Sequence, residues 1–212
     1  MTNRYLVGNA QTIGCREIQN NYFSTTYNDT GDLLAVLADG GIDHRNGRIA
    51  SMMAVGTCAG IFTQKFSYVE TMQINQFLLD TALKAQKHVK NVVFIGKSPR
   101  LSLTMGLFRG QELHYFSVGT NKIFLYNEQN EWVIGERTNN AFSEGKYPIA
   151  PKNIIGFLST GAYINSHPME RIRIIESKTE VFDKAQAIID TVKKKSLITQ
   201  LNATALLVEV AK

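Results

Sequence analysis

The side chains that could do chemistry gather in one polar segment that follows an apolar run. Leu34–Ala38 has the pattern of a strand, Asp39 and Gly40 end it, and a helix is expected to open at Ala50 and Ser51. Carboxylate oxygens bind hard divalent cations, and guanidinium groups bind phosphate. The same residue types also form turns and helix caps, so the segment has a structural interpretation beside the chemical one. Its polar residues are Asp39, Asp43, His44, Arg45 and Arg48.

Other catalytic patterns are missing from the sequence. No histidine lies at metal-ligand spacing from another along a helix, and no glycine loop ends in Lys-Ser or Lys-Thr before a helix. Cys15 and Cys58 have neither metal-type nor redox spacing, so we expect two small buried apolar residues. An N-terminal nucleophile would require removal of Met1 to expose Thr2, and nothing nearby would activate that hydroxyl.

The segment Leu34–Ser51 resembles the signature of the metal-dependent serine/threonine protein phosphatases, the PPM or protein phosphatase 2C family. In that family the strand delivers one carboxylate and the following glycine carbonyl to a pair of divalent cations. The resemblance therefore implies that Asp39 and Gly40 are metal ligands.

Four further blocks are similar to blocks of that family and follow in the same order. The resemblance covers nearly the whole chain, and it implies an α+β fold: a four-layer α-β-β-α sandwich of two antiparallel sheets flanked by helices. It also implies a single domain over residues 1–212. The blocks are Gly14–Asn21, Val118–Leu125, Phe157–Ala162 and Leu201–Thr204.

The departures from the family pattern fall on its acidic residues. Of five positions where the family has an aspartate, only Asp39 keeps one. Asparagine and threonine are weak neutral oxygen ligands, and leucine offers no ligand. The degenerate metal positions are Asn21, Thr120, Thr160 and Leu201.

This loss of charge bears on catalysis. Two divalent cations about 4 Å apart repel by roughly 17 kcal/mol at an effective dielectric of about 20, so a two-metal site needs several carboxylates. One carboxylate cannot hold such a pair, and we expect no metal cofactor. The alternative is one weakly bound magnesium or manganese ion, shared by Asp39, the Gly40 carbonyl and Asp43, or held by unrecognised ligands such as Asp29 or Asp32.

Two further features of the resemblance concern the substrate. The arginine equivalent to Arg16 contacts the substrate phosphate in active members, so Arg16 is a phosphate-binding candidate, with a surface charge or a structural ion pair as the alternatives. Active bacterial members also carry a longer flap between the central and late blocks. Here Asn127–Asn153 is the whole of that stretch, which implies a shortened flap.

The elements that must position these residues alternate as strands, a helix pair, strands and a last helix. This order favours antiparallel sheets over a doubly wound parallel sheet. Residues 135–153 read as a loop-rich region. Strands are expected at Tyr5–Val7, Tyr22–Tyr27, Leu33–Ala38, Val92–Ile95, Leu113–Val118, Lys122–Tyr126, Glu131–Ile134, Ile154–Leu158 and Thr204–Val210. Helices are expected at Arg48–Thr63, Val69–Val89, Pro168–Ile175 and Phe182–Lys195.

Composition sets the class of protein. The chain has 212 residues, 44% of them hydrophobic, and a formal charge of +5, which is too small an excess for a dedicated nucleic-acid binder. The basic run Lys193–Lys195 suits a helix C-terminus. No segment reads as a secretion signal or a membrane span, so we expect a cytoplasmic protein without nucleic-acid or membrane partners.

The leading hypothesis is a pseudophosphatase: a phosphatase-like domain that acts as a binding or regulatory module on a protein partner such as a phosphoprotein or a kinase. The alternative is a divergent metal-dependent phosphatase for phosphoserine and phosphothreonine that uses one metal or substitute ligands.

Overall fold

A computed structural model describes residues 4–41, 45–92, 101–127, 130–135, 142–196 and 198–211. The chain divides into two compact units built from non-contiguous segments. Unit 1 comprises Met1–Gln19, Thr120–Ile134 and Ala150–Lys212, and unit 2 comprises Asn20–Gly119 and Gly135–Ile149. The expectation of one domain over residues 1–212 stays a prediction.

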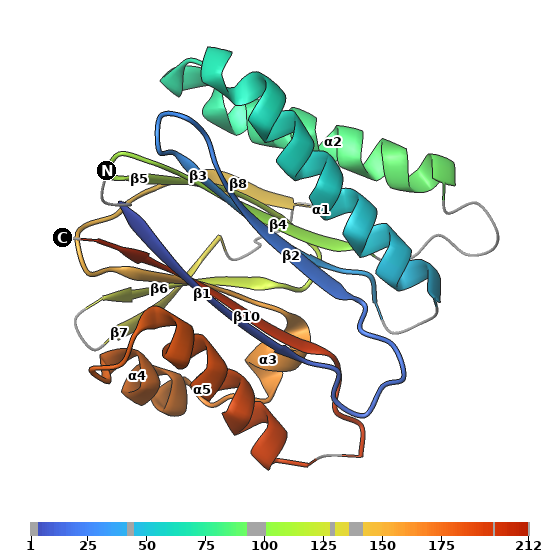
Figure 1. The fold of residues 1–212 in the computed structure, drawn as a ribbon, viewed down its shortest axis with the longest axis vertical. Helices are drawn as coiled ribbons and strands as arrows, with labels where there is room; N and C mark the ends of the chain where they lie inside the picture. Colours follow the sequence, from blue (N-terminus) through green and yellow to red (C-terminus); the bar gives the residue numbers. More distant parts are fainter. Residues whose placement is uncertain are drawn as a thin grey trace. The chain divides into compact units, whose positions relative to one another are not determined.

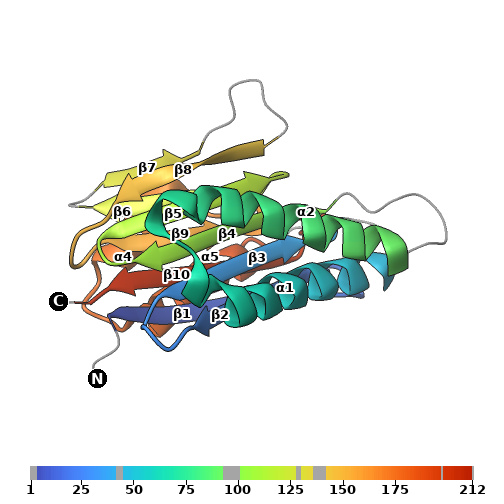
Figure 2. The same ribbon diagram turned by 90° about the horizontal axis from the view of Figure 1, so that it is seen from above.

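Unit 2 is a five-stranded antiparallel sheet with two helices on one face (Figures 1 and 2). The strand order is β2-β3-β4-β5-β8. Its strands are β2 (Asn21–Tyr27), β3 (Leu33–Asp39), β4 (Ser102–Arg109), β5 (Glu112–Val118) and β8 (Phe142–Pro148). Its helices are α1 (Arg45–Lys65) and α2 (Ile74–Val92), joined through the short turns η1 (Phe66–Tyr68) and η2 (Thr71–Gln73).

The helices of unit 2 form because their apolar residues recur at helical spacing. In α2 the apolar residues at this spacing are buried, from Ile74 and Leu78 to Val89. It packs with Cys58 and Phe62 of α1 on alternate residues of β3 and β4. Burial raises the pKa of the Cys58 thiol to about 12, so this cysteine is an inert core residue, as predicted.

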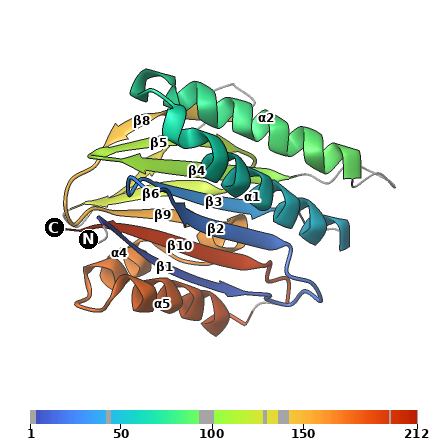
Figure 3. The same cartoon turned by 45° about the horizontal axis from the view of Figure 1, so that its top comes forward.

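Unit 1 is a second five-stranded antiparallel sheet, with the order β1-β10-β9-β6-β7. Helix α5 runs along β1 and β10, as Figure 3 shows. The strands are β1 (Tyr5–Thr12), β6 (Lys122–Asn127), β7 (Asn130–Ile134), β9 (Ile154–Leu158) and β10 (Ala203–Val210). The helices are α3 (Thr160–Ile164), α4 (Pro168–Glu176) and α5 (Val181–Lys194). The expected α+β class, with two antiparallel sheets flanked by helices, is confirmed.

Several sequence expectations fail for physical reasons. The prediction of a loop-rich region over residues 135–153 is wrong, because this region contains strand β8. Strand β4 and helix α3 were not predicted. The expected strand Val92–Ile95 is wrong at Val92, which ends α2, while residues 93–95 lie outside the described residues. Cys15 is exposed, although it was expected to be buried. The basic run does end a helix, since α5 finishes at Lys194.

A buried ion pair holds α4 to β7 in unit 1. The Arg171 side chain is 1% exposed and that of Glu131 is 7% exposed. Arg171 Nε donates to Glu131 Oε2 at 2.7 Å, and its Nη1 donates to the Ser166 carbonyl and to Ser166 Oγ. The guanidinium also lies over the Phe124 ring, 4.9 Å from its centroid. Arg171 Nη2 donates to Glu131 Oε1, so all three guanidinium nitrogens are engaged by the protein itself.

Breaking this pair should be costly because one buried charge would be left unpaired. We expect Glu131→Ala to lower the free energy of unfolding by about 3 kcal/mol in urea titrations. The double variant Glu131→Leu with Arg171→Met removes both charges and should lose much less. A single-variant loss below about 1 kcal/mol would contradict this account.

Candidate functional site

A polar row crosses one end of the unit 2 sheet. Asn21 on β2 is paired with Asp39 on β3, and Asp39 is paired with Ser102 on β4. Residues directly opposite on antiparallel strands point to the same face, and here it is the face that α1 and α2 do not cover. Asn21 is 2% exposed and Ser102 is 7% exposed. The sheet register thus brings together two of the predicted site positions, Asn21 and Asp39.

The turn after Asp39 is fixed by hydrogen bonds. The Gly41 amide donates to Asp39 Oδ1 at 2.8 Å, which is an Asx turn, and Gly41 has a φ of +80°. Asn20 stabilises the turn with two hydrogen bonds. Its side-chain Nδ2 donates to the Gly41 carbonyl at 2.9 Å, and its backbone carbonyl accepts from the Gly40 amide at 3.1 Å. Asp39 therefore has a structural task in addition to any chemical one.

Gly40 is a glycine because backbone fills the space beside it. A Cβ added there would collide with the Gly47 carbonyl in the first turns of α1. Conversely, a Cβ on Gly47 would lie 2.8 Å from the Gly40 carbonyl oxygen. The two glycines let β3 and α1 approach backbone to backbone, and this contact sets where the Asp39 turn lies relative to α1.

The Asp39 carboxyl group is held in a poorly solvated place. Burial raises its pKa above the usual 3.8, and the hydrogen bond from the Gly41 amide offsets part of that rise. A buried carboxylate costs folding free energy when it is ionised. Such a group is typical of functional sites, where a charged ligand can compensate the cost.

Unit 1 joins the two positions where the sequence has threonine in place of the expected aspartate. Thr160 Oγ1 at the start of α3 donates to Thr120 Oγ1 at 2.6 Å. Thr120 lies just before β6, so the bond links the central block to the late block across 40 positions of sequence. The neutral pair satisfies itself by hydrogen bonding, which two carboxylates at this distance could not do without a shared proton or cation.

Leu201 lies beside the same part of unit 1. Its Cβ would be 3.1 Å from a Cβ on Gly161, and its carbonyl 2.5 Å from a Cβ on Gly14. The neighbouring Asn202 Nδ2 donates to the carbonyls of Ile13 and Ile18 at 2.8 and 3.1 Å. Gly14, Gly161 and Leu201, which come from the first, late and closing blocks, therefore lie close together in unit 1.

These residues do not fit a pair of divalent cations. Within unit 2 the paired positions offer one carboxylate and one amide, Asp39 and Asn21. Within unit 1 the predicted positions offer two hydroxyls and an alkyl group. Among the described residues, no three of the His, Cys, Asp and Glu side chains gather into a metal-binding group. Asn21 and Asp39 in unit 2 carry one negative charge, and the three positions in unit 1 carry none, whereas two such cations carry four positive charges.

The substitute ligands considered in the sequence have different outcomes. Asp43 and His44 lie outside the described residues. Asp29 and Asp32 belong to the β2–β3 turn, at the opposite end of β3 from Asp39 and about 20 Å away. They are too far from Asp39 to share an ion with it, so any ion that they held would be a separate one.

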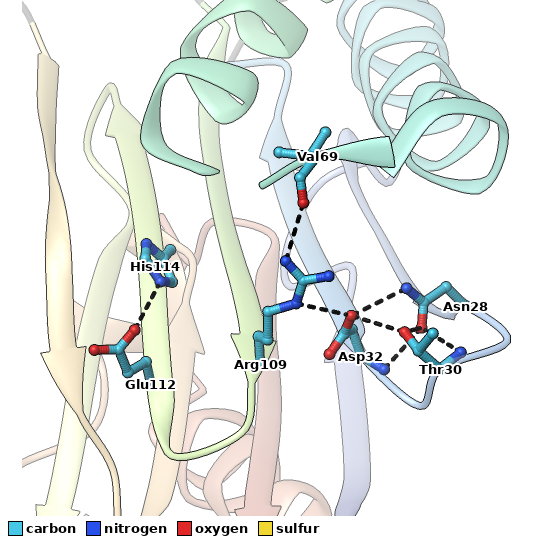
Figure 4. A network of polar contacts seen from close by, with 7 residues as sticks. All are labelled: Asn28, Thr30, Asp32, Val69, Arg109, Glu112 and His114. Carbon is cyan, nitrogen blue, oxygen red and sulfur yellow. Dashed lines mark hydrogen bonds and ion pairs between the residues drawn. The ribbon is translucent and has the colours of Figure 1, made fainter. Parts of the chain in front are cut away.

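Asp32 instead has a structural role, shown in Figure 4. Its Oδ2 accepts from Asn28 Nδ2 at 3.1 Å and from Thr30 Oγ1 at 2.9 Å. It also accepts from Arg109 Nε at 3.2 Å, while Arg109 Nη1 donates to the Val69 carbonyl at 3.1 Å. The Arg109 guanidinium is the counter-cation here, and it ties the turn to the α1–α2 connection.

The buried histidine in Figure 4 is structural as well. His114 Nδ1 lies 2.9 Å from Asn75 Oδ1 on α2, and its Nε2 lies 3.3 Å from Glu112 Oε2. Burial lowers the pKa of His114, although Glu112 acts in the opposite direction. The histidine joins β5 to α2 and stands apart from the predicted site residues.

Arg16 is half-buried in the segment that follows β1. Its amide donates to the Ile13 carbonyl at 3.4 Å, and the next-door Cys15 amide donates to Gln200 at 3.1 Å. Within the described parts of the chain its guanidinium forms no ion pair, so the ion-pair alternative has no partner there. Arg16 stays a phosphate-binding candidate.

Sequence reasoning missed one cavity, which lies in unit 1 among α3, α4 and the end of α5. Its volume is about 280 Å³. It contains none of the predicted site residues, and the lining residue Arg171 is already paired with Glu131. Its lining residues are Tyr163, Ile164, Ser166, His167, Pro168, Arg171 and Lys195.

Comparison with known proteins identifies the fold. No family model matches the sequence, and no curated protein matches it. Among solved structures, the S. agalactiae serine/threonine phosphatase is similar, with a TM-score of 0.84 at 16% identity over 97% of this chain and 99% of that chain. The Mycobacterium tuberculosis phosphatase PstP/Ppp gives 0.83 at 13% identity, over 98% and 99%. Stp1 from Staphylococcus aureus gives 0.84 at 14% identity, over 97% and 95%.

The chain therefore has the fold of the bacterial PPM-type serine/threonine phosphatases, which confirms the fold that the resemblance implied. Identities of this size establish the fold alone. No described helix is both long enough and apolar enough to cross a membrane.

The raised pKa of Asp39 predicts a stabilising substitution. Asparagine keeps the oxygen that accepts from Gly41 and removes the buried charge, so Asp39→Asn should raise the free energy of unfolding at pH 7 by on the order of 1 kcal/mol in EDTA. The charge penalty is present above the folded-state pKa and absent below the unfolded-state value of 3.8, so the difference between the two proteins should disappear as the pH falls past 3.8. The exposed Asp29→Asn is the control and should show little change. A destabilised Asp39→Asn protein at pH 7 would contradict the argument.

Proposed function

We propose that this chain is a pseudophosphatase, a PPM-type phosphatase fold without a competent two-metal site that acts as a binding or regulatory module. The Thr120–Thr160 hydrogen bond is the single observation that carries the proposal. The family pattern has aspartates at these two positions. Here they hold two neutral hydroxyl groups that are hydrogen-bonded to each other and carry no charge to attract a cation.

The charge of the other positions supports the same conclusion. Asn21 is buried against Asp39 in the sheet register, and Leu201 offers no ligand atom on its side chain. A two-metal hydrolase uses its cations to lower the pKa of the attacking water and to stabilise charge on the phosphoryl oxygens. None of these substitutes supplies either function.

A module of this kind would bind a protein rather than transform it. We place a phosphoprotein or a kinase first among its partners, because Arg16 can bind a phosphate by charge-assisted hydrogen bonds without a metal. Under this proposal the protein works in the cytoplasm, without nucleic-acid or membrane partners and without a required metal.

The retained Asp39 favours a second candidate, a divergent metal-dependent phosphatase for phosphoserine and phosphothreonine. The carboxyl group lies at the end of β3, next to Gly40, and burial has raised its pKa. One magnesium or manganese ion held weakly by this turn, with Asp43 as a further ligand, would give a one-metal enzyme. A shortened flap over residues 127–153 bears on both candidates, because it would change how a protein substrate is admitted.

The two candidates differ in metal-dependent turnover. We expect the purified chain, supplied with manganese or magnesium, to leave an aryl phosphate and a phosphothreonine peptide unhydrolysed, and calorimetry with manganese to give no heat of binding. Turnover that requires metal and disappears in Asp39→Asn would refute the pseudophosphatase proposal and support the second candidate.

Restoring the missing charge tests the proposal from the opposite direction. We expect a variant with aspartate at positions 21, 120, 160 and 201 to bind manganese by calorimetry. Without metal this variant should be less stable than the natural chain by about 1 kcal/mol or more, since Asn21→Asp opposes Asp39 directly. Asparagine at the same four positions is the matched control, with similar size and no charge.

If the four-aspartate variant folds and still binds no manganese, the charge deficit is not the reason for an incompetent site. Equal manganese binding by the asparagine control would lead to the same conclusion.

A further inference from the structure

The outer edge of unit 2 carries an unusual distribution of charge. Strand β8 pairs with β5 on one side and ends the sheet order, and no other described strand pairs with its second side. Glu144, Lys146 and Tyr147 are exposed. An edge strand presents unpaired backbone N–H and C=O groups to any extended chain that approaches it.

The sequence of β8 is complementary to itself. If a second β8 is laid antiparallel with the two-fold axis at Gly145, Glu144 of each copy falls opposite Lys146 of the other. Phe142 then faces Pro148, and Ser143 faces Tyr147. Opposite charges directly across antiparallel strands attract, and the symmetry supplies this attraction twice.

The register inside unit 2 puts both charges on the same face. Glu144 is paired with Phe116 and Lys146 with His114, so both side chains point to the side of the sheet that carries α2. Lys146 Nζ already lies 3.1 Å from Glu112 Oε1 of its own chain. In the paired arrangement each lysine would lie between two carboxylates, its own Glu112 and Glu144 of the other copy.

The centre of the strand is free of steric obstruction. Gly145 carries no side chain, and the space on its other face belongs to Tyr115, whose hydroxyl would be 2.9 Å from a Cβ at 145. The position on the two-fold axis therefore holds nothing that would push two strands apart.

The remaining edge strands lack this pattern. β1 and β2 contain no charged residue. The one charged residue of β7, Glu131, is already in an ion pair with Arg171. An edge lysine ordinarily discourages pairing between identical strands. The single lysine of β8, Lys146, disfavours any pairing that puts it opposite the same lysine of the other copy. It favours the antiparallel register centred on Gly145, where it lies opposite Glu144.

We propose that β8 docks a second copy of this chain, strand to strand and antiparallel, with the two-fold axis at Gly145. This inference is independent of the proposed function. The strands are short, so the contact is of the small class that gives weak, concentration-dependent dimers.

Charge reversal in the full chain tests both the surface and its register. Sedimentation velocity of the natural protein, across micromolar to millimolar concentrations, should show reversible self-association. Glu144→Lys brings lysine opposite lysine and Lys146→Glu brings glutamate opposite glutamate, so each variant alone should associate about tenfold more weakly. An equimolar mixture of the two restores opposite charges at every pair and should dimerise again.

Two controls isolate the surface. Glu176→Lys makes the same charge change at an exposed position of α4 and should leave association as in the natural chain. Glu112→Gln removes the partner of Lys146 within the same chain. This variant shows whether the weaker self-association of Lys146→Glu comes from losing that internal ion pair rather than from the contact between copies. A natural chain that stays monomeric at all concentrations overturns the proposal. So do single variants that associate as well as the natural chain, or a mixture that associates no better than its components.

Discussion

Within each unit, close approach of backbone to backbone at glycines fixes where the candidate site positions lie. Gly40 follows Asp39 and packs on Gly47, while Gly161 follows Thr160 and packs on the Asn202 carbonyl. Gly119 precedes Thr120 with a φ of +97°, and a Cβ there would collide with Ser102. At each place a side chain would have to displace main chain or a buried neighbour, which the close packing of an interior does not permit at low cost. These contacts place the site positions regardless of what those positions carry.

Charge is a separate requirement, and it is here that the chain departs from the family pattern. A carboxylate at position 120 or 160 contributes nothing to these backbone contacts, and without cations two of them would repel. Threonine at both positions replaces repulsion with the 2.6 Å hydrogen bond between the hydroxyls. Under the proposed function, the fold persists without the negative charge on which two-metal chemistry depends. Shape and reactivity are set by different residues, even where these are neighbours in sequence.

The sequence predicted the elements that show a local periodicity and missed those that depend on contacts with the rest of the fold. The α2 stripe from Ile74 to Val89 repeats at helical spacing, so periodicity finds it. Strand β4 is buried on both faces and shows no alternation, and β8 is a polar edge strand that reads as loop. The sequence alone offers Asp32 as a possible metal ligand, whereas in the fold it is paired with Arg109, which lies 77 positions away in the sequence. The Thr120–Thr160 contact is likewise invisible without the fold, although the resemblance had marked both positions.

Asp39 is the residue on which the two candidate functions divide. Its Oδ1 accepts the Gly41 amide, and an asparagine oxygen could accept the same bond without the penalty of a buried charge. The turn alone therefore does not account for a carboxylate at this position. A cationic group that binds there would offset the penalty, and in the second candidate that group is the single metal ion. A metal ion demands several oxygen ligands around it, and a single carboxylate with a glycine carbonyl supplies few of them, which favours the first candidate over the second.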